Sequence, residues 1–133
     1  MNFIDLGLPS GTLWAECNEE GFYTFNEAVE KFRDSLPTKE QFEELQTHCK
    51  WEWLGDGYKV TGTNGNSIVL PAAGYRFFDE CVDYVGSNGL YWSSTPYGSD
   101  YTWTLYFYSG SVYMDYAYRR YVRSVRLIKK HER

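Results

Sequence analysis

One ten-residue stretch, LYFYSGSVYM at positions 105–114, restricts the fold of this chain more than any other feature of its sequence. Ser109 and Gly110 fit a two-residue hairpin turn, because glycine readily adopts the positive φ that such turns require. With that turn, two all-apolar cross-strand pairs coincide on one face of the hairpin. These pairs are Phe107 with Val112 and Leu105 with Met114. We therefore predict an antiparallel hairpin in which these four residues are mostly buried.

The opposite face of this hairpin carries tyrosine. The same register places Tyr106 opposite Tyr113 and Tyr108 opposite Ser111. Since the apolar face is assigned to the core, we expect the tyrosines to point outward. Tyrosine also has a high strand propensity and occurs on solvated sheet faces for that reason alone. From the physics of the residues, a binding surface and an ordinary solvated sheet face are equally good explanations.

Two helices are predicted in the first half of the chain. The segment TFNEAVEKF begins with Thr24 and Glu27, which are spaced as a capping box. This helix must end before Pro37, because the residue before a proline avoids the α region. Thr38 and Gln41 form a second capping box, which opens a second helix. The apolar stripe of the first helix consists of Phe25, Ala28, Val29 and Phe32.

After Cys49 the apolar pattern changes to a period of two, which indicates strands. WEW and YKVTG are typical of strands, and Asn64-Gly65 marks a hairpin between two β-rich runs. From Leu90 onward we expect strands and loops to the end of the chain. The order of these elements predicts one α+β domain over residues 1–133, with two helices packed on short antiparallel strands.

The charge and the hydropathy of the chain argue against several function classes. The net charge is −5, whereas nucleic-acid-binding domains usually carry a basic excess. No run of eighteen apolar residues occurs, so we expect no membrane insertion. The first residues, MNFIDLGLPSGTLWAECN, have neither the basic region nor the long apolar region of a signal peptide. We therefore expect a protein that does not use that secretion route, or a fragment or module of a larger protein.

The cysteines and histidines show no recognisable metal-site spacing. Cys17, Cys49 and Cys81 lie far apart without a C-x-x-C pair, and His48 and His131 add no ligand cluster. We predict three small buried thiols and no cofactor. A disulfide between Cys17 and Cys49 stays open as an alternative.

The residue types in the C-terminal third are restricted. Between Cys81 and Ile128 there is no Lys, Glu or Gln, although the rest of the chain is rich in them. Random replacement of the adenines in the asparagine codon AAC can yield Tyr, Ser, Asp, Thr, Ala, Val or Arg, but not Lys, Glu, Gln, Met or Trp. The reachable types fill the outward or loop positions, while Trp103 and Met114 fall at inward ones, which is compatible with a hypervariable surface. The outward or loop positions are Tyr97, Ser99, Asp100, Tyr101, Thr102, Thr104, Tyr106, Tyr108, Ser111, Tyr113, Asp115, Tyr116, Ala117, Tyr118, Arg120, Tyr121, Val122 and Arg123.

Several longer motifs resemble a known family. DLGLPSGTLWAECN, LPTKEQFEEL, CKWEW, YKVTGTNGNSIVLPAAGYR, VGSNGLYWSSTP and SVRLI are similar to the small bacterial domains related to the Fibrobacter-type paralogous domain. That resemblance covers nearly the whole chain and implies a C-type-lectin-like fold. The C-terminal part also resembles the variable region of proteins that diversity-generating retroelements diversify. The chain departs from the family after Cys17, where related domains often carry a longer insertion.

The resemblance implies a fixed apolar framework and adenine-mutated positions on an exposed ligand-binding face within residues 95–123. The implied framework is Trp92, Leu105, Phe107, Gly110, Val112, Met114 and Val125. The ligand-binding residues that we expect from it are Tyr97, Asp100, Tyr101, Tyr106, Tyr108, Ser111, Tyr113, Asp115, Tyr116, Tyr118, Arg120, Tyr121 and Arg123.

The resemblance further implies a non-catalytic domain that binds a protein or glycan partner. Tyrosine suits this task, because it offers a large rigid contact area and a hydroxyl at a low entropic cost. Arginines 119, 120 and 123 add hydrogen-bond donors of the kind found at binding hot spots. Display on a cell surface or virion, as part of a larger protein or assembly, would fit this role.

Three rival functions are weaker. An enzyme of the formylglycine-generating type uses a cysteine pair late in the chain, and here no cysteine follows Cys81. A calcium-dependent lectin needs several carboxylate and carbonyl oxygens, and the segment STPYGSD offers only Asp100. An ordinary structural module whose tyrosines bind nothing is the remaining alternative.

The sequence predicts that folding is independent of metal ions, because neither a zinc nor a calcium ligand cluster is present. Treatment with EDTA should leave the melting temperature unchanged within about two degrees, since a ligand that binds only the folded state would raise it. Thermal melting followed by circular dichroism checks this. A drop of more than a few degrees, restored by added calcium or zinc, would contradict it.

Overall fold

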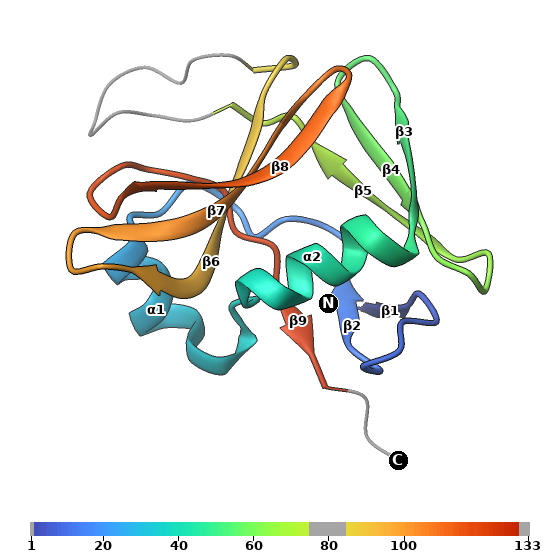
Figure 1. The fold of residues 1–133 in the computed structure, drawn as a ribbon, viewed down its shortest axis with the longest axis horizontal. Coiled ribbons are helices and arrows are strands. Elements are labelled where there is room, and N and C mark those ends of the chain that lie inside the picture. The colour runs from blue at the N-terminus through green and yellow to red at the C-terminus, as the bar shows by residue number, and fades with distance from the viewer. Residues whose placement is uncertain (1, 75–84, 131–133) are drawn as a thin grey trace.

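The computed structural model describes residues 2–74 and 85–130 and shows a mixed α and β fold (Figure 1). Within these residues, two helices accompany nine strands in three small antiparallel sheets, which agrees with the α+β prediction. No helix in this part of the chain is long and apolar enough to cross a membrane. The helices are α1 (Phe25–Phe32), the 3₁₀ turn η1 (Arg33–Ser35) and α2 (Lys39–His48).

Each sheet has three strands, which are consecutive in the sequence in the second and third sheets but not in the first. The first, in the order β1-β2-β9, joins Phe3–Asp5, Leu13–Ala15 and Ile128–Lys129, so it brings the two ends of the chain together. The second, β3-β4-β5, comprises Lys50–Trp53, Gly57–Thr61 and Ser67–Pro71. The third, β6-β7-β8, comprises Gly89–Tyr97, Tyr101–Tyr108 and Ser111–Tyr118.

Both helices begin as the sequence predicts. The Thr24 side chain accepts a hydrogen bond from the Glu27 N–H, and the Glu27 carboxylate accepts one from the Thr24 N–H at 2.8 Å. Thr38 and Gln41 make the same reciprocal pair at the start of α2. The predicted apolar stripe of α1 is wrong at Val29, which is 38% exposed. This side chain lines an open groove instead of packing on the core.

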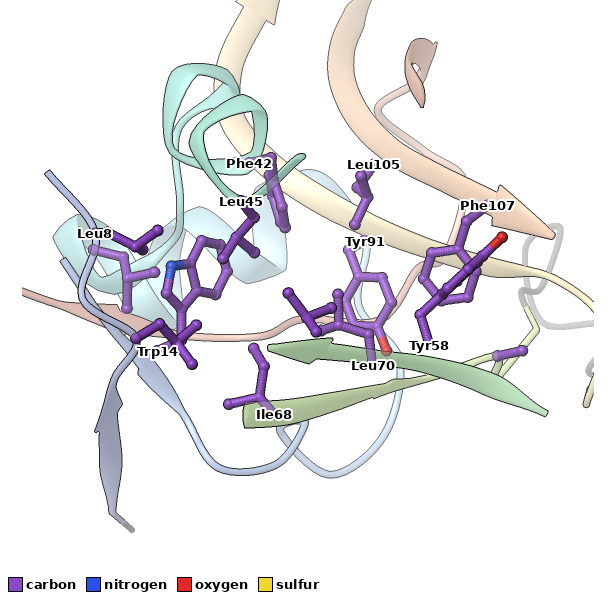
Figure 2. Packing of buried hydrophobic residues seen from close by; sticks show 14 residues of the cluster. Leu8, Trp14, Phe42, Leu45, Tyr58, Ile68, Leu70, Tyr91, Leu105 and Phe107 are labelled. Atoms are coloured by element: carbon purple, nitrogen blue, oxygen red, sulfur yellow. The ribbon is translucent and has the colours of Figure 1, made fainter. Parts of the chain in front are cut away.

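The main core lies between α2 and the sheets (Figure 2). Phe42 and Leu45 from α2 approach Trp14 from β2, and the Trp14 and Phe42 ring centroids lie 5.2 Å apart. A second, smaller cluster lies between α1 and the third sheet. It consists of Phe25, Ala28, Leu36, Trp92, Ala117 and Val125.

Arg126 is fully buried and joins the three sheets. Its guanidinium donates to the carbonyl of Ala15 in β2 at 2.9 Å, to the carbonyl of Val69 in β5 and to the side-chain oxygen of Asn18 at 2.8 Å. The Asn18 amide in turn donates to the hydroxyl of Tyr91 in β6 at 2.9 Å. Burial lowers the pKa of Arg126, because desolvation disfavours its charge.

The predicted register of the β7–β8 hairpin is confirmed at every pair. Leu105 and Phe107 are fully buried, as expected. Val112 and Met114 are less completely buried, and both pack against the main core. They stand on β8, the outer strand of the sheet, where fewer neighbours cover the core face. Gly110 has a φ of 89°, as the turn requires.

A tyrosine outside the hairpin holds its turn against the core. The Tyr58 hydroxyl in β4 donates to the Tyr108 carbonyl at 2.9 Å and accepts from the Gly110 N–H at 3.0 Å. The Tyr58 ring meets the Phe107 ring edge to face at 5.2 Å. Figure 2 shows these two rings side by side. The tip of the hairpin is therefore fixed to the second sheet.

The cysteine prediction is wrong in part. Cys17 is exposed and Cys49 is half-buried, and both are free thiols, so the alternative disulfide between them is not formed. Cys17 follows β2 at the surface, where the chain leaves the core. Cys81 and His131 lie outside the described residues.

Phe107 should be the most sensitive position of the hairpin. Its ring contacts Tyr58 and Tyr91 and leaves no room for a side chain at Gly89. Phe107→Ala should therefore lower the free energy of unfolding by about 3–5 kcal/mol, as truncations of buried aromatic residues do. Urea unfolding measures the loss, and the neighbouring Tyr108→Ala, at an exposed position, should cost within about 0.5 kcal/mol. Equal losses in both variants would contradict the assignment of the hairpin faces.

Candidate functional site

The tyrosines of the third sheet lie on both of its faces. The register pairs Tyr101 with Tyr118 and Trp103 with Tyr116. By the alternation of strands, these residues share the face of Leu105, whereas Tyr106 and its partner Tyr113 lie on the opposite face. The expectation of a single outward tyrosine face is therefore wrong. Tyr101, Trp103, Tyr116 and Tyr118 lie on the core-side face of the sheet but are not fully buried.

The first face carries a set of rings that we call the distal aromatic cluster. It comprises Tyr97, Tyr101, Trp103, Tyr116 and Tyr118. Tyr97 stacks on Tyr116 with ring centroids 4.5 Å apart and an interplanar angle of 8°. These two side chains are 43% and 47% exposed. The cluster is thus an ordered aromatic surface, because its rings hold one another in place.

Lys39 contacts one ring of this cluster, and Tyr118 forms a hydrogen bond with another. The Lys39 ammonium at the start of α2 lies 4.6 Å from the Trp103 ring centroid, a cation–π distance. A hydrogen bond with Tyr118, followed by desolvation and nearby charges, raises the pKa of Tyr101. The Tyr101 hydroxyl is therefore neutral near pH 7, where it can donate and accept hydrogen bonds.

The second face carries a smaller aromatic set. Tyr106 stacks on Tyr113 at 5.2 Å, and the Asn88 amide donates to the Tyr106 hydroxyl at 2.7 Å. Tyr108 and Tyr113 are 42% and 38% exposed. Desolvation, and then the neighbouring Tyr106, raise the pKa of Tyr113. Tyr106 and Tyr113 together form what we call the Tyr106–Tyr113 stack.

A pocket of about 360 Å³ opens beside the Tyr106–Tyr113 stack. Thr104, Asp115 and Ala117 contribute to it from β7 and β8, and Tyr121 and Arg123 from the segment that follows β8. This volume is at the small end of the range for ligand pockets and fits a single side chain or a sugar unit.

Five positions expected to face outward are buried: Thr102, Thr104, Ala117, Val122 and Arg123. The reason is tertiary, because α1 and the segment after β8 cover this part of the second face. Arg123 is 4% exposed, and its guanidinium lies 5.1 Å from the Tyr121 ring and 6.0 Å from the Trp92 ring. Of the expected ligand-binding residues, Arg123 alone is buried, although it still lines the pocket.

The remaining expected site residues lie around the two aromatic sets. Asp100 is exposed next to the β6–β7 turn, Ser111 faces Tyr108, and Tyr121 is half-buried against the second cluster. The Asp115 carboxylate accepts from the Tyr116 N–H at 2.8 Å. The Arg120 guanidinium lies 4.8 Å from the Tyr118 ring.

Three residues take roles that the sequence reasoning did not assign. Arg119 was expected to donate hydrogen bonds to a ligand. Its guanidinium instead donates to the carbonyls of Tyr101 and Gly98 at 3.2 and 2.9 Å and so supports the β6–β7 turn. Trp103 lies on the core-side face, as its alternation with Leu105 predicts, but its place in the distal aromatic cluster was not predicted. Lys39 lies more than sixty positions away in the sequence, and nothing in the local pattern connects it to Trp103.

Within residues 2–74 and 85–130, no group of three or more His, Cys, Asp or Glu side chains could hold a metal ion. The candidate site consists of aromatic rings with their hydroxyls, the carboxylates of Asp100 and Asp115, and arginine side chains.

Comparison with known proteins gives one family match. The profile of a family described as "Domain of unknown function (DUF8237)" matches residues 57–128, which is more than half of the chain. The matched segment contains β4 and β5 of the second sheet and the whole third sheet. No curated protein and no solved structure matches the chain.

The two described cysteines should differ in reactivity. Burial, and then the charge of Glu44, raise the pKa of the Cys49 thiol to about 11, whereas Cys17 is exposed. In a Cys81→Ser background at pH 8, iodoacetamide should therefore label Cys17 first, because the thiolate is the nucleophile. Mass spectrometry of timed samples measures both sites. Labelling of Cys49 should accelerate as the pH rises toward 11, and equal rates at pH 8 would contradict the structure.

Proposed function

We propose that this chain, which belongs to the DUF8237 family, is a non-catalytic ligand-binding domain whose third sheet displays a tyrosine-rich surface. The partner that this surface suits is a protein or a glycan. The binding residues are the exposed members of the two aromatic sets and the polar side chains around them.

The observation that carries this proposal is the exposure of ordered aromatic rings. Large exposed hydrophobic side chains on the described surface include four tyrosines of one sheet: Tyr97, Tyr108, Tyr113 and Tyr116. On each face these rings contact other rings, and exposed apolar patches mark interaction sites in soluble proteins. Because the rings already contact one another, little conformational freedom is lost on binding, which favours affinity.

The surroundings of the rings supply polarity and specificity. Tyrosine hydroxyls, the Asp115 carboxylate and the Arg120 guanidinium lie at the margins of the aromatic sets. Tyrosine and arginine are the residue types most enriched at binding hot spots. The arrangement is suited to recognition, and it requires no reaction chemistry.

The proposal includes a C-type-lectin-like fold and hypervariable positions. Its support is the motif resemblance, the position of the first and last strands in one sheet on either side of β2, and the two helices beside short antiparallel sheets. The genomic test is direct. A near-copy of the codons for residues 95–123, with adenines at the exposed positions and a reverse transcriptase gene beside it, would support diversification.

A structural module without a ligand is the second candidate function. Half-burial of Tyr101, Tyr106, Tyr118 and Tyr121 favours it, since these rings also stabilise the sheet. If the domain binds a ligand through the exposed tyrosines, their replacement should abolish binding. If it is a structural module, there is no binding to lose.

The variant Tyr97→Ser, Tyr113→Ser, Tyr116→Ser separates these functions. Each exposed change should cost within about 0.5 kcal/mol, plus a few tenths for lost cross-strand contacts, so the domain should stay folded. Binding to any hit from a glycan array or a displayed peptide library should fall at least about tenfold, because aromatic anchors carry most interface energy. Thermal melting and titration are measured on the same sample.

A matched control replaces three exposed apolar residues elsewhere on the surface. Val29, Leu54 and Val69 are 38%, 50% and 41% exposed and lie outside the third sheet. Their replacement by Ser should leave binding unchanged. If the control variant loses binding and the tyrosine variant retains it, the site lies elsewhere. An unfolded tyrosine variant would show that the rings serve the fold.

A further inference from the structure

The outer edge of β8 is long and weakly protected. The other edge of the third sheet is covered, because the Ser124 N–H donates to the Leu90 carbonyl and the Ser124 carbonyl accepts from the Trp92 N–H, both at 3.1 Å. β8 has eight residues, with Asp115 as its one charge and no lysine or proline. Charged residues, prolines and bulges are what proteins commonly use to stop a free edge from pairing.

Hydrogen bonds identify the backbone groups of β8 that point away from β7. Three such groups on alternate residues make contacts outside the strand ladder. The Val112 carbonyl accepts from the Gln46 amide at 3.2 Å, the Tyr116 N–H donates to Asp115 at 2.8 Å, and the Tyr118 carbonyl accepts from the Tyr121 N–H at 3.1 Å.

Because the backbone alternates with a period of two, the N–H and carbonyl of Met114 face the same edge, as does the carbonyl of Tyr116. Outside the ladder, no hydrogen bond to these groups occurs within residues 2–74 and 85–130. The middle of the edge therefore offers a donor and two acceptors at strand spacing.

The side chains on the two sides of this edge are both aromatic. Tyr116 and Tyr118 belong to the distal aromatic cluster, and Tyr113 belongs to the Tyr106–Tyr113 stack on the opposite face. A strand added along β8 would direct its side chains alternately toward these two sets. This explains why the exposed tyrosines occupy both faces, which a ligand lying flat on one face would not require.

We propose that the ligand is an extended polypeptide segment of another protein, which adds to β8 as a further strand of the third sheet. The inference rests on the proposed function, since it specifies how the same surface binds. A polypeptide backbone supplies donors and acceptors at the spacing of the β8 edge, and strand addition is a known mode of peptide recognition. A glycan can stack on one face but does not repeat that spacing. A second copy of the chain would bring two net charges of −5 together, which opposes self-pairing.

The test compares two changes at Met114. Met114→Pro removes the edge N–H, and proline is tolerated where a strand N–H faces solvent. Met114→Ala loses the same side-chain packing but keeps the N–H, so it is the matched control. The probe is a synthetic linear peptide selected on the wild-type domain from a displayed random library. Met114→Pro should bind it at least about tenfold more weakly than Met114→Ala, with similar melting temperatures.

The possible outcomes separate this inference from the proposed function. Equal affinity of both Met114 variants, with loss of binding in the Tyr97, Tyr113 and Tyr116 variant, overturns strand addition and leaves the tyrosine surface as the site. Selection of glycans but no peptide overturns it as well. A wild-type dimer in sedimentation that Met114→Pro converts to monomer assigns the edge to a second copy instead.

A direct readout on the wild-type protein covers the case in which Met114→Pro fails to fold. Amide hydrogen exchange followed by NMR measures the Met114 N–H with and without the peptide. Slower exchange in the complex is expected if that N–H pairs with an added strand. Unchanged exchange at Met114 in the saturated complex would overturn the inference.

Discussion

The rest of the structure depends on the buried guanidinium of Arg126. It binds carbonyls in two different sheets and, through Asn18, the Tyr91 hydroxyl in the third. Its hydrogen bonds to two backbone carbonyls and to the Asn18 side-chain oxygen let several dipoles share the stabilisation of one charge. A buried charge is costly unless its hydrogen bonds are satisfied. The three sheets are therefore held in one arrangement, because any shift between them would break these bonds.

That arrangement gives the third sheet its rigidity. Tyr91 is fixed by the Arg126 network on β6, and Tyr58 holds the β7–β8 turn from β4. Between these anchors, Phe107 fills the space against Gly89 and both tyrosine rings. Aromatic side chains farther along the strands then project from a fixed backbone, which is the condition for binding without a large ordering cost.

The two aromatic sets have different physical support. In the distal aromatic cluster, rings stack on rings and Lys39 lies over Trp103, so exposed groups keep one another in place. The Tyr106–Tyr113 stack is held by Asn88 and stands beside a pocket. The edge of β8 runs between them. The β8 edge thus has the distal aromatic cluster on one face of the sheet and the Tyr106–Tyr113 stack on the other.

The sequence by itself determined the local structure. The capping boxes of both helices involve residues three positions apart, and the hairpin register follows from a two-residue turn and strict alternation, so the physics lies within a few residues. Tertiary structure decided which faces are covered. Alternation shows that Thr104 and Tyr106 share a face, but only the return of the chain beside β6 buries the first fully and leaves the second half-buried. The link between Asn18 and Arg126 spans 108 positions, and Lys39 reaches Trp103 across the fold. Such contacts depend on how distant elements pack, which no local pattern of residues encodes.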